Sequence, residues 1–371
     1  MPFDVTFMSH PQPRDCGDYR HRTLWPAKAL GELVPTVAVQ TLHPDSFSAM
    51  LQCHLLVVGM VADSDVQAII EERKARGLPT IYEISDDFKC FPSNTSLGSI
   101  FYDRADVQNQ IETLAQLSDG LQFSSPFLAQ KYGHLNPRHT VLMNQAWELP
   151  SLPEAPHNAT VRIGWTASGG HLEDAKALAK LFSEAFERDP KLAQELQICL
   201  MTSPKLAEAF EAQGLSIERT PTGSFESYME FVSSLDGGIA HLQMDDFAQG
   251  RSDGKYIEFA CRGVPIVCHN SGTFAHTIRH KANGLLYSNA EEFQIALSAL
   301  VRQPRLRTHL RTQAIRNVRE YRNHQCAAKE RLAFYEQVVN QCHAPPSVRS
   351  PFANEAFVSL EHPLESKLYA T

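Results

Sequence analysis

The chain has 371 residues, of which 43% are hydrophobic and 20% are charged. This composition is typical of a globular protein and excludes collagen-like, fibrous and wholly disordered classes. At roughly 100–200 residues per domain, the length predicts two domains. The formal charge of −8 argues against a nucleic-acid partner, because proteins that bind nucleic acid normally present net positive charge.

The N-terminal residues show no sign of an export signal. They lack a basic start and a long apolar stretch. The longest apolar run, 55–62, is far shorter than the roughly 20 residues that a membrane helix needs. The eight cysteines include no CxxC pair, which favours reduced, structural thiols. We expect a cytoplasmic protein, with peripheral contact at the inner face of the membrane as an alternative.

Short apolar runs alternate with helical patterns over the first 150 residues. Strands are predicted over 4–8, 36–39, 55–60, 80–84, 120–123 and 140–143. Helices are predicted between them, over 23–33, 63–76 and 105–116. Strands that alternate with helices form crossover units, so we expect a doubly wound parallel sheet with helices on both faces.

The same alternation restarts after a proline-rich stretch. Strands are predicted over 160–165, 196–201, 236–241 and 265–268, and helices over 172–188, 204–213, 225–233 and 255–261. A helical pattern then runs from 303 to about 339. The α/β chain is therefore expected to hold two tandem Rossmann-like domains, over 1–150 and 159–302, with a linker over 151–158, a helical segment over 303–342 and an irregular tail over 343–371. Ligands of such sheets bind outside the carboxyl ends of the strands and in the cleft between domains.

The most informative stretch begins at Arg251, with the sequence Arg-Ser-Asp-Gly-Lys-Tyr-Ile-Glu. Ser252 and Asp253 can cap a helix that starts near Gly254, and the free N–H groups of that helix would then face a phosphate. Arg251 and Lys255 supply positive charge at the same end. This pattern predicts an anion site.

A carboxylate follows on the same helix face. Glu258 lies three residues past Lys255, where it can accept hydrogen bonds from two ribose hydroxyls. With Gly-Val-Pro-Ile-Val at 263–267 and Asn-Gly-Leu-Leu-Tyr at 283–287, the stretch resembles the donor-site signature of glycosyltransferases of the group 1 type, which have the two-domain GT-B fold.

This resemblance implies that Glu258 holds the donor ribose, that Arg251 and Lys255 stabilise the leaving diphosphate, and that Ser252, Asp253 and Tyr256 belong to the same donor site. It also implies two domains that face each other across a cleft, and transfer with retention of configuration. The sequence departs from the family pattern at Gly250. There the family carries a first glutamate that reaches the donor sugar.

A second glycine-containing turn follows the strand predicted over 160–165. Ser168, Gly169 and Gly170 are small enough to let a backbone approach a phosphate, and the helix from His171 or Leu172 points its N-terminus there. The stretch 162–174 resembles the opening of the donor domain in the same glycosyltransferases. We therefore assign Ser168, Gly169, Gly170 and His171 to donor binding.

Two places in the first domain are candidates for acceptor binding. Asp86 and Asp87 follow the strand 80–84 at its carboxyl end, and an acceptor-binding or general-base role stays open beside a plain helix cap or loop ion pair. The basic loop 14–22 faces the acceptor by family analogy, and a solvated turn is the alternative. From this loop we assign Tyr19, Arg20 and Arg22 to the acceptor site.

No metal ion is expected to take part. His276 and His280 lack a third ligand at motif spacing. The adjacent pairs at 86–87 and 245–246 are not the Asp-x-Asp of metal-dependent transferases. The segment 302–331 carries nine Lys or Arg. We expect a solvated helix face there, with contact to anionic lipid or a lipid-diphosphate acceptor as the alternative.

The leading hypothesis is an enzyme that transfers a hexose-type sugar from a UDP- or GDP-linked donor, without a further cofactor, to a glycan, lipid-linked or protein acceptor. One alternative is a transferase-like binding or scaffold subunit without turnover, which the departure at Gly250 favours. A second alternative is a sugar-nucleotide epimerase of the same architecture. A dinucleotide dehydrogenase is disfavoured, because no G-x-G-x-x-G follows the first strand.

Overall fold

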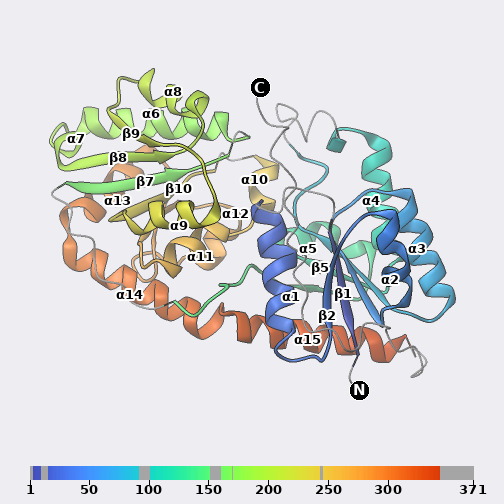
Figure 1. Cartoon of the computed structure of the whole chain (residues 1–371). Coiled ribbons are helices and arrows are strands. Elements are labelled where there is room, and N and C mark those ends of the chain that lie inside the picture. The colour runs from blue at the N-terminus through green and yellow to red at the C-terminus, as the bar shows by residue number, and fades with distance from the viewer. Residues whose placement is uncertain are drawn as a thin grey trace.

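The computed structural model describes residues 3–9, 16–91, 101–150, 160–168, 170–242 and 245–342. The predicted linker over 151–158 and the tail over 343–371 lie outside the described residues. Two parallel six-stranded sheets form the two halves of the molecule (Figure 1). The predicted α/β class with two doubly wound domains is confirmed.

The first sheet has the strand order β2-β1-β3-β4-β5-β6, and its strands all run parallel. Its strands are β1 (Val5–Ser9), β2 (Val37–Thr41), β3 (Leu55–Val58), β4 (Thr80–Ile84), β5 (Gly120–Phe123) and β6 (His139–Val141). β3 and β4 are buried at every position, as expected for central strands that helices cover on both faces.

The helical elements of this half connect the strands. They are the π-helical turn η1 (Tyr19–Leu24), α1 (Trp25–Leu30), η2 (Pro44–Ser46), α2 (Phe47–Gln52), α3 (Ser64–Ala75), α4 (Ala105–Leu117), α5 (Pro126–Tyr132) and η4 (Gly133–Leu135). The side chains of α2 to α5 form one core on the sheet, and α1 helps to form a second. The sheet is therefore packed on both faces.

The second sheet has the order β12-β11-β10-β7-β8-β9, again with all strands parallel. The strands are β7 (Val161–Thr166), β8 (Leu196–Met201), β9 (Ile217–Thr220), β10 (Gly237–Ala240), β11 (Ile266–His269) and β12 (Leu285–Tyr287). The direction of winding reverses between β7 and β10, and this reversal is where ligands bind in such sheets. The short strands β9 and β12 were not predicted.

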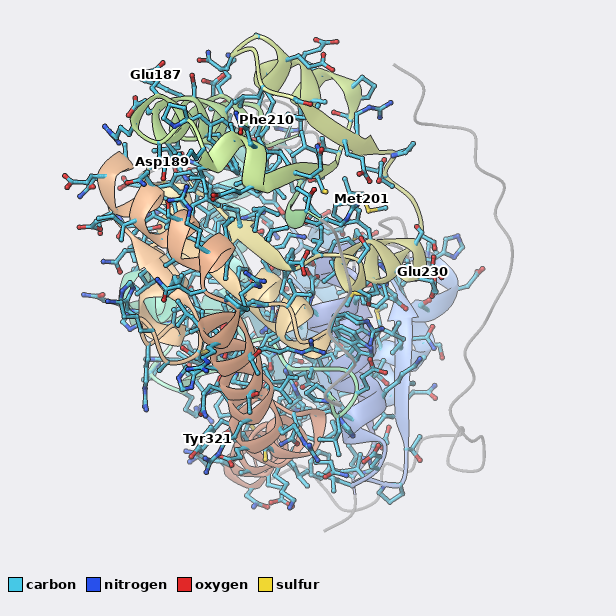
Figure 2. The ribbon with its side chains drawn as sticks, turned by 90° about the vertical axis from the view of Figure 1, so that its left-hand side faces the viewer. Glu187, Asp189, Met201, Phe210, Glu230 and Tyr321 are labelled. Atoms are coloured by element: carbon cyan, nitrogen blue, oxygen red, sulfur yellow. The ribbon has the colours of Figure 1, made fainter. Side chains whose placement is uncertain are left out.

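The helices of the second half lie on both faces of its sheet. They are α6 (Leu172–Arg188), α7 (Leu192–Glu195), α8 (Pro204–Glu211), α9 (Phe225–Ser233), α10 (Asp246–Gly250), α11 (Gly254–Cys261), α12 (Gly272–Thr277) and α13 (Ala290–Arg302). Figure 2 shows that Phe210 points into this half while Glu187 and Asp189 lie at its surface. Phe210 is fully buried in the core with Phe182 and Leu178.

The helical stretch predicted from 303 to 339 is two helices, and they serve different halves. α14 (Pro304–Tyr321) packs on α11 and α13, whereas α15 (His324–Gln341) returns to the first half and packs on α1. Tyr335 and Val338 of α15 are fully buried there. A Cβ atom at Gly120 would lie 3.0 Å from Val338 Cγ2, so the glycine lets α15 approach the sheet.

Candidate functional site

The carboxyl ends of the two sheets open into one cavity of about 450 Å³. The first half supplies residues that follow β1 and β4, among them Asp18 and Asp86. The second half supplies residues at the ends of β7 and β10, such as Ser168 and His241, and the start of α11. The cavity therefore lies between the halves, where the alternation of strands and helices predicted a ligand.

Glu258 lies in the cavity wall on α11 and is only 8% exposed. Its Oε1 lies 3.2 Å from Nε2 of His21, and its Oε2 accepts a hydrogen bond of 2.7 Å from the Tyr228 hydroxyl. Lys255 Nζ lies 3.3 Å from the same Oε2. Burial opposes ionisation, but Lys255, His21 and Tyr228 outweigh it, so the pKa of Glu258 lies well below its ordinary value. The carboxylate is ionised, which makes it a strong acceptor for hydroxyl groups.

Two cations predicted to face the donor both line the cavity. Lys255 Nζ lies 3.1 Å from the Tyr228 hydroxyl and 4.6 Å from the centre of that ring. Arg251 Nη2 lies 3.4 Å from His171 Nε2, and its Nη1 lies 3.8 Å from Asp86 Oδ1. Both cations are about one-third exposed, so their charged ends can reach a ligand in the cavity.

The start of α6 contributes to the same wall. Ser168 and His171 line the cavity, and His171 occupies the N-cap position of this 17-residue helix. The Nδ1 of His171 lies 2.7 Å from Asp174 Oδ2, which orients the ring toward Arg251. Gly169 lies outside the described residues, and Gly170 is exposed beside the cavity wall without lining it.

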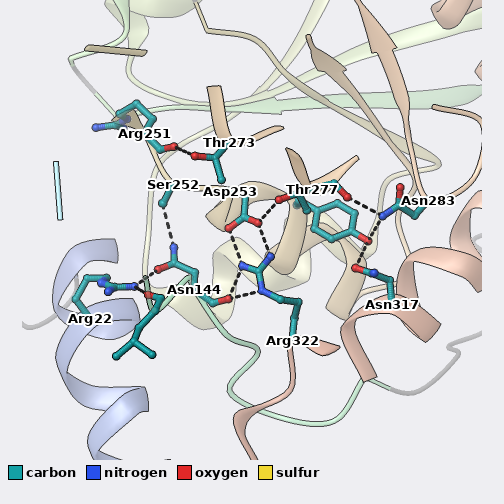
Figure 3. Close-up of polar contacts among 12 residues, drawn as sticks. Arg22, Asn144, Arg251, Ser252, Asp253, Thr273, Thr277, Asn283, Asn317 and Arg322 are labelled. Carbon is teal, nitrogen blue, oxygen red and sulfur yellow. Dashed lines mark hydrogen bonds and ion pairs between the residues drawn. The ribbon is translucent and has the colours of Figure 1, made fainter. Parts of the chain in front are cut away.

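Asp253 does not face the cavity, which corrects its assignment to donor binding and to a helix cap. It is fully buried, and its two oxygens accept hydrogen bonds of 2.7 and 2.9 Å from Arg322 (Figure 3). The Thr277 hydroxyl donates a further hydrogen bond of 2.7 Å. The side chain makes no capping bond to the start of α11. Neighbouring Ser252 does line the cavity, and its hydroxyl accepts a hydrogen bond of 3.0 Å from Asn144.

Tyr256 is also turned away from the cavity. Its side chain is fully buried in the core behind α11. Its hydroxyl donates to Asn317 Oδ1 and accepts from Asn283 Nδ2, each at 2.9 Å (Figure 3). The assignment of Tyr256 to the donor site is corrected, because this network belongs to the packing of α14 and the turn before β12 against α11.

The two adjacent aspartates after β4 lie in different environments. Asp86 lines the cavity beside Arg251. Asp87 is fully buried behind it, where Lys131 lies 2.6 Å from Oδ2 and the Tyr132 hydroxyl donates a hydrogen bond of 2.5 Å to Oδ1. Asp87 is therefore the loop ion pair considered as its alternative, and its assignment as a catalytic residue is corrected.

Of the three residues assigned to the acceptor site, two line the cavity and one does not. Arg20 and Arg22 line the cavity, but Tyr19 lines a separate space of about 20 Å³ beside it. Arg20 lies 4.5 Å from the centre of the Phe225 ring. Arg22 is 5% exposed, and its Nε donates a hydrogen bond of 2.5 Å to Glu83 Oε1. Tyr19 is thus displaced from the acceptor site that we predicted for it.

Sequence reasoning missed several residues of the cavity wall. Trp25 lies against Trp147 and Phe225, with ring centres 4.8 and 5.3 Å apart. Because these rings come from separate segments, no local pattern could have identified them. Asp18 and Tyr228 were missed as well. The signal for Asp18 was its place in the loop between the first strand and the first helix, which the arginines of the same loop obscured.

Gly250 packs against residues of the first half of the molecule. A Cβ atom there would lie 3.2 Å from Asp87 Cβ and 3.2 Å from Leu128 Cδ2, and the Ser125 hydroxyl donates a hydrogen bond of 3.2 Å to the Gly250 carbonyl. A larger side chain at this position would crowd Asp87 and Leu128, which would have to shift by a few tenths of an ångström.

The basic segment 302–331 is largely engaged within the chain. Arg302 pairs with Asp189 and Glu195, and Arg331 is buried beside Gln122 and Tyr335. Arg322 holds Asp253. These contacts favour the structural interpretation of the segment, and contact with lipid stays a prediction.

Among the residues that the structure describes, no group of three or more His, Cys, Asp or Glu side chains is placed to hold a metal ion. No helix within the same described ranges is long and apolar enough to cross a membrane.

No protein-family description matches this chain, and no curated protein sequence matches it either. Several solved structures are similar to this chain. Anabaena HepE in complex with UDP and glucose has a TM-score of 0.65 at 10% identity, over 90% of this chain and 100% of HepE. Sucrose-phosphate synthase from Thermosynechococcus elongatus has a TM-score of 0.65 at 11% identity, over 91% of this chain and 100% of that one.

S. aureus TarM, in complex with fondaparinux, alpha-GlcNAc-glycerol and UDP, has a TM-score of 0.56 at 12% identity. The match covers 77% of this chain, which spans about half (55%) of the length of TarM. Two facing parallel sheets, a shared cavity at their carboxyl ends and these likenesses together show that this chain has the GT-B fold.

Proposed function

We propose that this protein is a glycosyltransferase that uses a nucleoside diphosphate sugar. One observation supports this most strongly: the ionised Glu258, Lys255 and Arg251 line a single cavity at the carboxyl ends of the second sheet. The first half closes the same cavity from the opposite side. Such a cavity can hold a donor and an acceptor together.

The roles of the residues follow from charge. Glu258 would accept hydrogen bonds from the two ribose hydroxyls, in place of the contact that His21 now makes. Arg251, Lys255 and the N-termini of α6 and α11 would face the diphosphate. Negative charge on the diphosphate grows as its bond to the sugar breaks, so these groups stabilise the transition state more than the bound donor.

The comparisons suggest which donor to test first. The structures of HepE and TarM were obtained with UDP, and TarM also with the glycan fondaparinux. We propose a UDP-linked sugar as donor and a glycan as acceptor. Because side chains and helix N-termini supply the positive charge, we also propose that transfer needs no metal ion.

Turnover of labelled donors tests this function. The purified chain is incubated with UDP-glucose, UDP-N-acetylglucosamine and GDP-mannose, with and without a mixture of oligosaccharides, in EDTA or in Mn²⁺. We expect one donor to release its nucleoside diphosphate and to label an oligosaccharide equally well in EDTA. Release of no nucleotide from any donor would contradict the proposal, and a strict need for Mn²⁺ would contradict the metal-independent form of it.

A binding protein without turnover is the second candidate, because Gly250 leaves the donor sugar without the glutamate of the family pattern. This candidate predicts that a nucleotide sugar binds and stays intact in every mixture. The same incubations, analysed for bound and for cleaved donor, distinguish the two.

A further inference from the structure

Three aromatic side chains form a row across the carboxyl end of the second sheet. His241 directly follows β10, His269 ends β11 and Tyr287 ends β12, and the register of these parallel strands places them next to one another. The centre of the His269 ring lies 5.5 Å from that of His241 and 5.3 Å from that of Tyr287. All three residues are buried. The function proposed above uses none of them.

The hydroxyl of Tyr287 decides which nitrogen of His241 carries a proton. Burial lowers the pKa of His241 to about 4, with a smaller contribution from His269 and against the opposing effect of Asp174, so the ring is neutral at neutral pH. The Tyr287 hydroxyl lies 2.6 Å from His241 Nδ1, which is its only hydrogen-bond partner among the described residues. A buried hydroxyl that does not donate is costly, so Tyr287 donates and Nδ1 accepts. The single proton of the neutral ring is therefore on Nε2.

The ring of Tyr287 is itself held firmly. His269 packs against it at an interplanar angle of 61°, and Phe293 packs against it at 69° with ring centres 5.0 Å apart. The Nδ1 of His269 lies 3.0 Å from the Ser271 hydroxyl, which fixes that ring in turn. The Tyr287 hydroxyl therefore has a fixed position from which to hold His241.

The other nitrogen of His241 lacks a partner. His241 is 8% exposed and lines the shared cavity, and its Nε2 makes no hydrogen bond within the part of the chain that the structure describes. The residue separates this cavity from a second one of about 270 Å³, which Tyr287 and His269 line. Since the two nitrogens of an imidazole lie on opposite edges of the ring, Nε2 points away from Tyr287 and from the second cavity. A buried N–H without a partner is costly, so it indicates an oxygen that a ligand in the shared cavity would supply.

The neighbours of His241 indicate which oxygen this is. Asp174, in the first turn of α6, is close enough to His241 and His269 to influence the pKa of both. The same carboxylate lies 2.7 Å from His171, which lies 3.4 Å from Arg251. The start of α6 and Arg251 are the groups that would face the diphosphate of the donor. His241 is therefore at the diphosphate end of the cavity.

We propose that His241 donates a hydrogen bond from Nε2 to an oxygen of the donor diphosphate, and that Tyr287 is the positioning residue that fixes the tautomer needed for this bond. The proposal rests on the proposed function, because it adds a residue to the donor site of that same cavity. Negative charge on the diphosphate grows as its bond to the sugar breaks, so the hydrogen bond strengthens toward the transition state. His241 keeps its proton throughout, and no further reactant is needed.

His241→Phe tests the hydrogen bond, because it keeps an aromatic ring and removes the N–H. Loss of one preorganised donor typically costs ~10²–10³ in rate, so we expect kcat to fall about 100-fold while the KM for the donor changes less than about threefold. His241→Gln, whose amide N–H can occupy the place of Nε2, should keep most of the activity. His309→Phe, at an exposed position of α14, is the matched control. A kcat of His241→Phe within a few-fold of wild type would overturn the role of His241.

Tyr287→Phe tests the positioning role, because it removes only the hydroxyl oxygen. We expect its kcat to lie between those of wild type and His241→Phe, and its affinity for UDP, measured by calorimetry, to match wild type. In the double variant with His241→Phe, the loss of the hydroxyl should cause no further fall in kcat. Tyr321→Phe is the matched control, since Tyr321 is 66% exposed. An equal loss from Tyr287→Phe with and without His241 would overturn the positioning role.

Nitrogen NMR of the histidine rings tests the tautomer without turnover. The protein is labelled with ¹⁵N-histidine, and the signals absent from His241→Gln are assigned to His241. Near neutral pH we expect a proton on Nε2 and none on Nδ1, a shift of the Nε2 signal when UDP or GDP is added, and a mixture of tautomers in Tyr287→Phe. A proton on Nδ1 in wild type, or a Nε2 signal that does not shift with a nucleotide that calorimetry shows to bind, would overturn this proposal alone. If neither UDP nor GDP binds, the proposed function is wrong as well.

Discussion

At the scale of single residues, Glu258 has the strongest influence on the candidate site. Its carboxylate is buried, ionised and held by partners from both halves of the molecule. The free-energy cost of burying this charged carboxylate is met when the protein folds. A ribose that enters the cavity therefore meets a hydrogen-bond acceptor that is already ionised and in place. The side chain therefore has a role that a neutral residue of the same shape cannot fill.

We predict that Glu258→Gln weakens the binding of UDP by about 1–3 kcal/mol, because hydrogen bonds to a charged group are lost. Isothermal titration calorimetry measures the loss. Glu230→Gln is the matched control, since Glu230 lies exposed on α9 (Figure 2). Equal affinity of Glu258→Gln and wild type would remove Glu258 from the donor site.

In the proposed reaction, Arg251 and Lys255 stabilise the transition state more than the bound donor. We predict that Arg251→Ala and Lys255→Ala each lower kcat more than they raise the KM for the donor, because charge on the diphosphate grows toward the transition state. Losses of ~10²–10³ in rate are typical when one preorganised group is removed. Single-turnover kinetics separates the steps. A surface pair of Arg251 with Asp86 and no other role would instead cost under ~1 kcal/mol for every substrate.

The sequence predicted those residues whose positions depend on one helix. Lys255 and Glu258 lie on α11 and Arg251 lies three residues before it, so their spacing alone placed them at one site. Asp253 and Tyr256 belong to the same stretch, yet the orientation of each is decided by residues far along the chain, such as Arg322 and Asn317. A local pattern contains no information on those partners.

At the scale of elements, the buried strands were predictable and the C-terminal helices were not. β3 is a continuous apolar run, and β4 is mostly apolar with one charged residue, Glu83; runs of this kind identify central parallel strands. The break between α14 and α15 falls at Arg322 and Asn323, where no proline or glycine marks it. The side chain of Asn323 accepts a hydrogen bond from Cys326 N–H and so starts the new helix.

Docking of α15 on the first half should contribute strongly to stability. Phe334 is 8% exposed and packs in the core that α1 and β1 form. We predict that Phe334→Ala lowers the free energy of unfolding by about 3–5 kcal/mol, as large buried truncations do. Chemical denaturation measures it, with the exposed Glu336→Ala on the same helix as control. A loss as small as that of the control would mean that α15 is not firmly docked.

At the scale of the whole molecule, a polar network joins the two halves. Arg322 binds Asp253 of the second half through two hydrogen bonds, and it donates two more to the carbonyl of Asn144, which follows the first sheet (Figure 3). Asn144 in turn donates to Ser252 at the cavity. The network fixes the halves around the candidate site.

We predict that Arg322→Gln destabilises the protein by about 3–5 kcal/mol, because it leaves the buried Asp253 carboxylate without its partner. Differential scanning calorimetry should show a lower melting temperature, and separate transitions if the halves lose contact. Arg319→Gln on the exposed side of α14 should change little. Identical melting curves for both variants would show that the network does not join the halves.

The central claim is that the shared cavity binds a nucleoside diphosphate sugar through Glu258. Saturation-transfer NMR on the full chain with UDP-glucose, and in parallel with GDP-mannose, tests it most directly. For at least one donor we expect strong saturation of the ribose protons in wild type and in Glu230→Gln, and its loss in Glu258→Gln. Absence of saturation for both donors in wild type, or equal saturation in Glu258→Gln, would contradict the account.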